Sequence, residues 1–339
     1  KRNTFINVIG KKVYGDDAFK KLKPRTKNLL LPRGSTIPVT TFSLKCAIVS
    51  LLTNLSLMTD RNLLLNVDNP FESKGVGEIL DEIDTGWWFS ETTDTLCKGS
   101  SDVLLPLIFF IDGSVIDNNG RLSVEPVTMT LGIFNRETRN KAEAWRSLGY
   151  IEDLKNKVTA DAIPSKQSSA KLQDYHAILD HILTELKYIQ GEKGGFNWKI
   201  NLNGKSHNIV FKVALQVIIG DCKGNDILCG CFGSHSKTSR GFCRDCKVTY
   251  SASDDPNHQC VFIRPSDFKG KSAHEVNDLG FHVINNAFDQ IDFGARDLGV
   301  FGCTPSEPLH AFKLGLCKYL FDYLIDEMPP KTNKAIDEK

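Results

Sequence analysis

The feature that most constrains the fold is a nearly unbroken apolar run at residues 104–111, which ends in Asp112, Gly113 and Ser114. A half-exposed strand would alternate with polar residues, so this run is typical of a central strand buried on both faces. A carboxylate at the end of such a strand lies at the rim of the sheet, where a metal ion or a substrate can reach it. Asp112 is therefore the first candidate catalytic residue.

A second apolar segment, residues 209–219, also leads to a carboxylate, that of Asp221. The Asn-Gly step at 203–204 predicts a hairpin that joins this segment to a strand at 198–202. Residues 171–190 place apolar side chains at intervals of three and four, which predicts an amphipathic helix before the hairpin. The order of these elements predicts an α/β fold in which two buried strands each deliver an Asp.

Two carboxylates in one cleft repel each other, and a divalent cation relieves that repulsion. Two such ions about 4 Å apart can activate a water molecule and stabilise the leaving oxygen in phosphodiester cleavage. Oxygen ligands select Mg²⁺ or Mn²⁺. We therefore expect the carboxylates of Asp112 and Asp221 on adjacent strands, roughly 4–8 Å apart. The alternative is that both are ordinary strand-end residues that start turns.

Seven of the ten cysteines lie between Cys222 and Cys303, a concentration better suited to metal binding than to scattered disulfides. Cys243 and Cys246 form a CxxC pair, whose spacing lets two thiolates bind one Zn²⁺ from a tight turn. The second pair of ligands would come from one of two flanks: Cys229, Cys231 and His235 upstream, or His258 and Cys260 downstream. The spacing does not decide between the flanks, and free buried cysteines are the alternative.

Charge and hydropathy restrict the possible partners. With 42 Lys and Arg against 41 Asp and Glu, the net charge is +1, so any DNA-binding surface must be local. The sequence contains no apolar run of about 18 residues and no secretory signal, which predicts a soluble intracellular protein without a membrane partner. The first 37 residues are basic and are either a solvated arm or a contact to the DNA backbone. Residues 39–58 predict a packed helix.

A third cluster of functional residue types occupies 305–310. Ser306 can cap a following helix, which places Glu307 at the positive end of the helix dipole and His310 beside it in the first turn. Taken alone, this arrangement needs no function.

Together, and in this order, these segments resemble the catalytic region of CACTA-type and Plavaka-like cut-and-paste transposases of eukaryotic DNA elements. The resemblance covers roughly residues 40–325 as short motifs separated by diverged sequence. The matching motifs are 107–112, 120–123, 126–127, 131–134, 148–150, 220–221, 242–246 and 307–310.

The resemblance implies a ribonuclease H-like fold with DDE chemistry, in which Asp112 matches the first acid and Asp221 the second. Glu307 and His310 match the acid-x-x-His motif of the family, with Glu where related sequences often have Asp or Cys. The third acid, a Glu on a later helix, has no secure match. The chain is therefore expected to be a catalytic-region fragment that is inactive by itself, or a decayed or domesticated relative.

The predicted fold is thus an α/β, ribonuclease H-like mixed sheet flanked by helices. We expect an N-terminal basic arm and helical region at 1–100, the first part of the core at 101–228, a zinc-knuckle insertion at 229–265 and the remainder of the core at 266–339.

The predicted function is metal-dependent DNA cleavage and strand transfer in the intact protein, which acts in the nucleus on transposon ends and forms a possible homo-oligomer. Arg121, Arg139 and Arg244 are candidate DNA contacts, with solvated or salt-bridged side chains as the alternative. The competing hypothesis is a zinc-stabilised nuclear binding protein, derived from a transposase, that does not cleave DNA.

Overall fold

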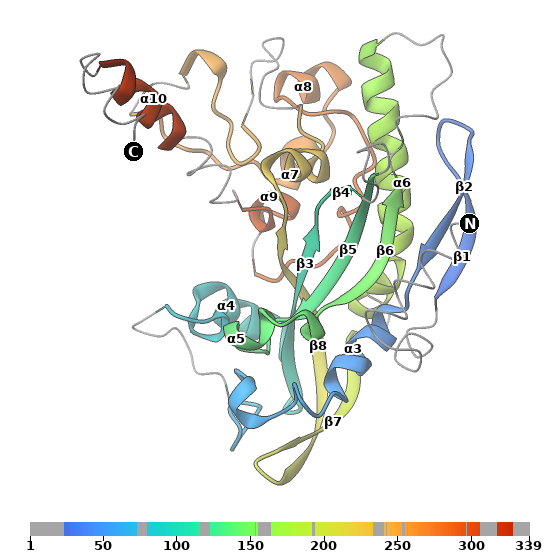
Figure 1. Cartoon of the computed structure of the whole chain (residues 1–339), viewed down its shortest axis with the longest axis vertical. Helices are drawn as coiled ribbons and strands as arrows, with labels where there is room; N and C mark the ends of the chain where they lie inside the picture. The colour runs from blue at the N-terminus through green and yellow to red at the C-terminus, as the bar shows by residue number, and fades with distance from the viewer. Residues whose placement is uncertain are drawn as a thin grey trace, which may run out of the picture.

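The computed structural model describes residues 24–72, 80–115, 123–152, 154, 164–191, 194–232, 241, 243–252, 255, 257–295, 297–305 and 317–327. Their main feature is a curled, mixed eight-stranded sheet (Figure 1). Seven strands follow the order β1-β2-β6-β5-β3-β8-β7, and β4 pairs with β5. The strands are β1 (Arg25–Leu30), β2 (Thr36–Thr41), β3 (Asp102–Ile111), β4 (Ser114–Val115), β5 (Ser123–Leu131), β6 (Arg146–Glu152), β7 (Phe196–Leu202) and β8 (Lys205–Ile219).

The centre of the sheet is an antiparallel meander followed by a crossover. β3 pairs antiparallel with β5, and β5 pairs antiparallel with β6. The chain then passes through the long helix α6 (Pro164–Gln190) and the β7–β8 hairpin, and β8 returns parallel to β3. The predicted buried strands, the amphipathic helix and the hairpin are confirmed. Asn203 and Gly204 form the hairpin turn with the positive φ angles that an Asn-Gly step favours.

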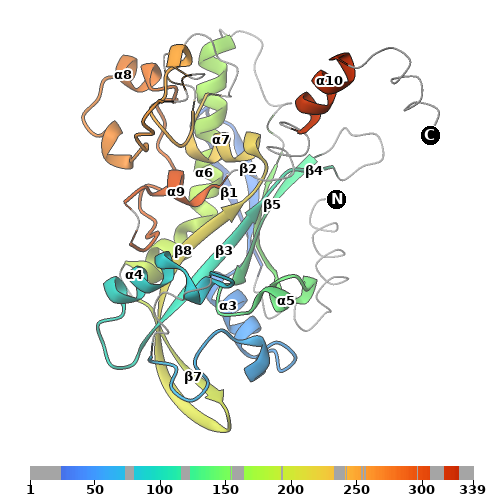
Figure 2. The same ribbon diagram turned by 90° about the vertical axis from the view of Figure 1, so that its left-hand side faces the viewer.

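Strand β3 is buried on both faces because each face carries its own layer. Its residues at odd positions belong to the main core, which also contains the apolar side of α6 (Figure 2). On the other face, Leu104 packs with Trp88 of α4 (Trp87–Leu96) and with Ala214 of β8. This double coverage explains the apolar run, although Phe110 on the second face is exposed near the end of β3.

The N-terminal region contains the expected helix and also two strands that the sequence pattern did not predict. Helix α3 (Leu44–Leu52) lies within the predicted range of 39–58, and the Ser43 hydroxyl caps it by accepting from the backbone N–H of Cys46. β1 and β2 extend the sheet beyond β6. The region before residue 100 is therefore more than an arm and helices.

Short helices follow the sheet strands. They are α5 (Arg136–Arg139), α7 (Cys222–Cys229), α8 (Ala273–Asp278), α9 (Val300–Cys303) and α10 (Lys318–Glu327). Helix α7 begins directly after β8, whereas α5 lies near α4 at the opposite end of β3 (Figure 1). Among the described residues, no helix has the length and apolar character needed to cross a membrane.

Candidate functional site

The sheet register brings Asp112 and Asp221 to the ends of neighbouring strands. β3 and β8 are parallel, and the last residues in register are Phe110 and Ile219, each two positions before an Asp. Adjacent strands lie about 4.8 Å apart. The strands approach closely at Gly220, where an added Cβ would lie 2.6 Å from the carbonyl oxygen of Ile111. The two acids therefore leave the same edge of the sheet side by side.

The local surroundings of the two acids differ. Asp221 is the N-cap of α7, and its carboxylate accepts a hydrogen bond from the backbone N–H of Gly224. This cap is a structural role that explains an acid at this position without any catalysis. Asp112 is half-buried, and its carboxylate caps none of the helices that the structure describes. Within the described residues, a helix cap accounts for the acid at Asp221 but not for the acid at Asp112.

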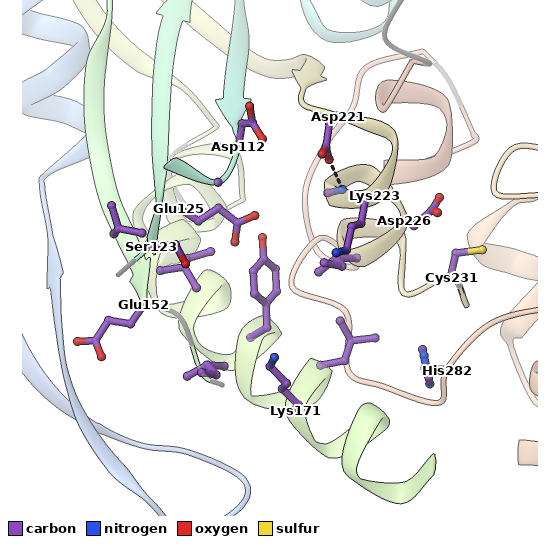
Figure 3. Close-up of a pocket in the computed structure, with 18 residues that line it drawn as sticks. Asp112, Ser123, Glu125, Glu152, Lys171, Asp221, Lys223, Asp226, Cys231 and His282 are labelled. Atoms are coloured by element: carbon purple, nitrogen blue, oxygen red, sulfur yellow. Dashed lines mark hydrogen bonds between the residues drawn. The ribbon is translucent and has the colours of Figure 1, made fainter. Parts of the chain in front are cut away.

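Both acids line a cavity of about 530 Å³ (Figure 3). Its walls come from the ends of β3 and β8, from the start of β5, from the end of β6, and from α6 and α7. Five carboxylates line it, those of Asp112, Glu125, Glu152, Asp221 and Asp226, against two lysines, Lys171 and Lys223. This excess of negative charge repels a DNA phosphate unless a cation enters with it.

Glu125 is a third carboxylate beside the Asp pair, and the sequence analysis missed it. The pKa of Glu125 is raised to about 7, chiefly by burial and also by the charges of Asp112 and Asp221, while the nearby Tyr175 hydroxyl opposes the rise. A Glu in an alternating strand usually faces solvent, so the strand pattern does not predict that Glu125 lines the cavity. Its position in the sequence does offer a signal, because Glu125 lies near the start of β5, and β5 begins beside the end of β3.

Tyr175 of α6 forms the floor of the cavity next to Glu125. Its side chain is 8 % exposed, and its hydroxyl has no partner at hydrogen-bond geometry among the described residues. Burial raises the pKa of Tyr175, and the Glu125 carboxylate adds to this effect. The Tyr175 hydroxyl and the Glu125 carboxylate are therefore close enough to shift each other's pKa.

The two described arginines that were predicted to contact DNA lie elsewhere. Arg139 lies on α5, away from the cavity, and its guanidinium nitrogen is 2.7 Å from a carboxylate oxygen of Glu82. Arg244 is 6 % exposed, and its guanidinium pairs with Asp226 at 2.9 Å. Arg244 is therefore salt-bridged and enclosed by protein in this structure, and a DNA contact by Arg244 stays an untested prediction. Arg121, Glu307 and His310 lie outside the described residues.

The cysteines divide into two groups. Cys243 accepts a hydrogen bond at its Sγ from the backbone N–H of Asp245 over 3.4 Å, and the Cys246 thiol interacts with the thiols of Cys243 and Cys260. Cys229 and Cys231 belong instead to the hydrophobic core. Burial raises the pKa of Cys229 to about 12, and its Sγ lies 3.3 Å from the Thr304 hydroxyl.

The predicted zinc knuckle is not established by this geometry. Within the part of the chain that the structure describes, no three Cys, His, Asp or Glu side chains come close enough together to hold a metal ion. His258 is exposed, and the ten cysteines are all free thiols. Cys260 lies beside the CxxC pair, and the upstream Cys231 also interacts electrostatically with Cys243.

The described residues thus define a mixed α/β protein with an acid-lined cavity at the carboxyl ends of two parallel strands. Residues 55–322 match the family model of the Plavaka transposase, so the chain belongs to the Plavaka transposase family. The family membership confirms the predicted resemblance. A search of curated proteins finds no match.

Proposed function

We propose that this chain is the catalytic core of a cut-and-paste DNA transposase, which uses Mg²⁺ or Mn²⁺ to cleave and rejoin phosphodiester bonds at transposon ends. The observation that carries the proposal is the placement of Asp112 and Asp221 at the ends of adjacent parallel strands, in a chain of a transposase family. The meander of β3, β5 and β6, followed by α6 and a strand parallel to β3, supports a ribonuclease H-like fold. Nuclear action and a possible homo-oligomer are part of this proposal.

The donor set of the cavity fits a hard divalent cation. Asp112 and Asp221 offer oxygen ligands, which Mg²⁺ and Mn²⁺ prefer, and Mg²⁺ is usually bound by one or two carboxylates with water and substrate oxygens in the remaining positions. When bound, such an ion activates water and stabilises the leaving oxygen. The buried strands β3 and β8 hold the two carboxylates rigidly, which is the positioning that in-line attack requires.

Two lysines are placed to receive the DNA backbone. Lys171 on α6 and Lys223 on α7 line the same cavity as the carboxylates (Figure 3). Ammonium groups bind phosphate oxygens as point charges, and such contacts position DNA without reading its sequence. Lys171 and Lys223 therefore take the place of the enclosed Arg244 in our proposal, while Arg121, Glu307 and His310 remain predicted contributors.

Substitutions at Asp221 separate its cap from its proposed metal ligation. Serine caps a helix about as well as aspartate but cannot hold a cation by charge. We expect Asp221→Ser to abolish Mn²⁺-dependent nicking with little change in stability, and Asp221→Ala to abolish nicking and also to cost about 1 kcal/mol. Nicking by the full-length protein and urea unfolding measure the two effects.

Retention of nicking by Asp221→Ser would mean that Asp221 is only a helix cap. In that case cleavage does not depend on the Asp221 carboxylate, and the proposed metal site of Asp112 and Asp221 is rejected. The intact Asp pair argues against long decay of an ancestral catalytic site.

We further propose that Cys243, Cys246 and Cys260 belong to one structural Zn²⁺ site, with His258 as the nearest predicted fourth ligand in the sequence. The N–H donation to Cys243 Sγ supports this, because it stabilises a thiolate.

Metal analysis of the purified protein tests this site. We expect one equivalent of zinc in the wild type and its loss in Cys243→Ser and Cys260→Ser, since each removes a thiolate ligand. Cys97→Ser is the matched control, because Cys97 lies outside this cluster on the loop after α4. Less than one equivalent in the wild type rejects the site, and loss through Cys229→Ser alone assigns it to the upstream pair.

A further inference from the structure

Glu125 lies where β5 passes the end of β3. Ile111 of β3 pairs with Val127, and Ser114 of β4 pairs with Val124, so Glu125 is held between these two pairings beside Asp112. Figure 3 shows its side chain pointing from β5 into the cavity that Asp112 and Asp221 share. The sheet register therefore places a third carboxylate at the proposed metal centre.

Glu125 is half-buried at the wall of this cavity. A carboxylate that is partly removed from water is costly unless a cation or hydrogen-bond donors compensate it. The Tyr175 hydroxyl lies near Glu125 and lacks a partner at hydrogen-bond geometry among the described residues. The half-buried Glu125 carboxylate and the buried Tyr175 hydroxyl thus face the same space.

We propose that Glu125 is a positioning residue of the metal centre, which would accept hydrogen bonds from the water ligands of a divalent cation that Asp112 and Asp221 would hold. This inference rests on the proposed function. Contact through water, rather than direct ligation, follows from the geometry, because no three such side chains among the described residues converge on one ion. Mg²⁺ retains several water ligands, and these donate to neighbouring carboxylates.

The Tyr175 hydroxyl completes the arrangement. When the Glu125 carboxylate accepts hydrogen bonds from metal-bound water, the Tyr175 hydroxyl can donate a further hydrogen bond to it and so fix the orientation of the carboxylate. Partners of this outer kind change metal affinity by about 10-fold to 100-fold when they are removed. The third acid expected on a later helix would add to this set and is not replaced by Glu125.

A calorimetric titration of the full-length protein with Mn²⁺ measures the binding affinity directly and so tests the inference without relying on activity. We expect Glu125→Gln to weaken Mn²⁺ binding by about 10-fold to 100-fold. The Mn²⁺ concentration for half-maximal nicking should rise by the same factor, while the rate at saturating Mn²⁺ changes less. Glu152→Gln is the matched control, because it removes one charge from the same cavity but its side chain points away from Asp112 (Figure 3).

The thermal midpoint of the metal-free protein separates this role from a structural one. Because a half-buried carboxylate beside two others destabilises the metal-free fold, Glu125→Gln should leave the midpoint unchanged or raise it. A second variant, Tyr175→Phe, removes only the hydroxyl and should weaken Mn²⁺ binding by a smaller factor.

Unchanged Mn²⁺ affinity in Glu125→Gln, or an equal loss in Glu152→Gln, overturns the inference. If Glu125→Gln does not fold, unchanged affinity in Tyr175→Phe overturns it instead. Failure of the proposed function gives a different result, in which Asp112→Asn also binds Mn²⁺ as tightly as the wild type.

Discussion

Asp112→Asn is expected to reduce Mn²⁺-dependent DNA nicking by the full-length protein roughly 1000-fold. The change keeps the size of the side chain but removes the charge that holds the cation. A metal ion contributes several kcal/mol to stabilising the transition state, and about 4 kcal/mol corresponds to three orders of magnitude in rate. The measurement is the single-turnover nicking rate of a transposon-end duplex at saturating Mn²⁺.

The fold should not change in this variant, because Asp112 is half-buried at the rim and lies outside the apolar core. Asp180→Asn is the matched control: it makes the same chemical change on the exposed side of α6, where Asp180 pairs with Lys187. Equal nicking by the wild type and Asp112→Asn would remove Asp112 from catalysis. The non-catalytic hypothesis predicts instead that the wild type shows no Mn²⁺-dependent nicking.

The parts of this site that could be predicted from the sequence are those that a buried strand imposes. An apolar run that ends in an acid predicts a buried strand with a carboxylate at its end, so the sequence predicts β3 and β8 together with Asp112 and Asp221. Their adjacency required only that β8 return parallel to β3. The structure supplies that crossover through α6 and the β7–β8 hairpin.

Glu125 and Arg244 could not be placed from the sequence for a shared reason. Each is a charged residue whose local pattern is typical of a solvent-facing side chain, and each is enclosed by segments that are distant along the chain. Glu125 meets Tyr175 of α6, about 50 positions later, and Arg244 meets Thr304. Tertiary contacts of this kind override a local pattern, and no periodicity reports them.

Arg244 gives the largest effect expected on stability. Besides Asp226, its guanidinium donates to the carbonyl oxygens of Cys222 at 3.3 Å and Thr304 at 3.2 Å. It thereby joins the CxxC segment to the start of α7 and to the end of α9. Burial raises the pKa of Asp226 although Arg244 opposes this rise. The carboxylate is therefore poorly tolerated without its partner.

Arg244→Met is expected to lower the free energy of unfolding by about 3 kcal/mol, because it leaves a largely buried carboxylate and two carbonyl groups without their donor. Urea unfolding measures this loss. The double variant Arg244→Met/Asp226→Asn should recover part of it, since the unpaired charge is then gone. If Arg244 contacted DNA, the variant would instead keep its stability within about 0.5 kcal/mol of the wild type, and the salt dependence of its DNA binding would fall by about one phosphate contact.

Because the guanidinium is enclosed, we expect the salt dependence of DNA binding by the folded variant to match that of the wild type. Arg244 would then act on the site only by holding α7, and with it Asp221, in place.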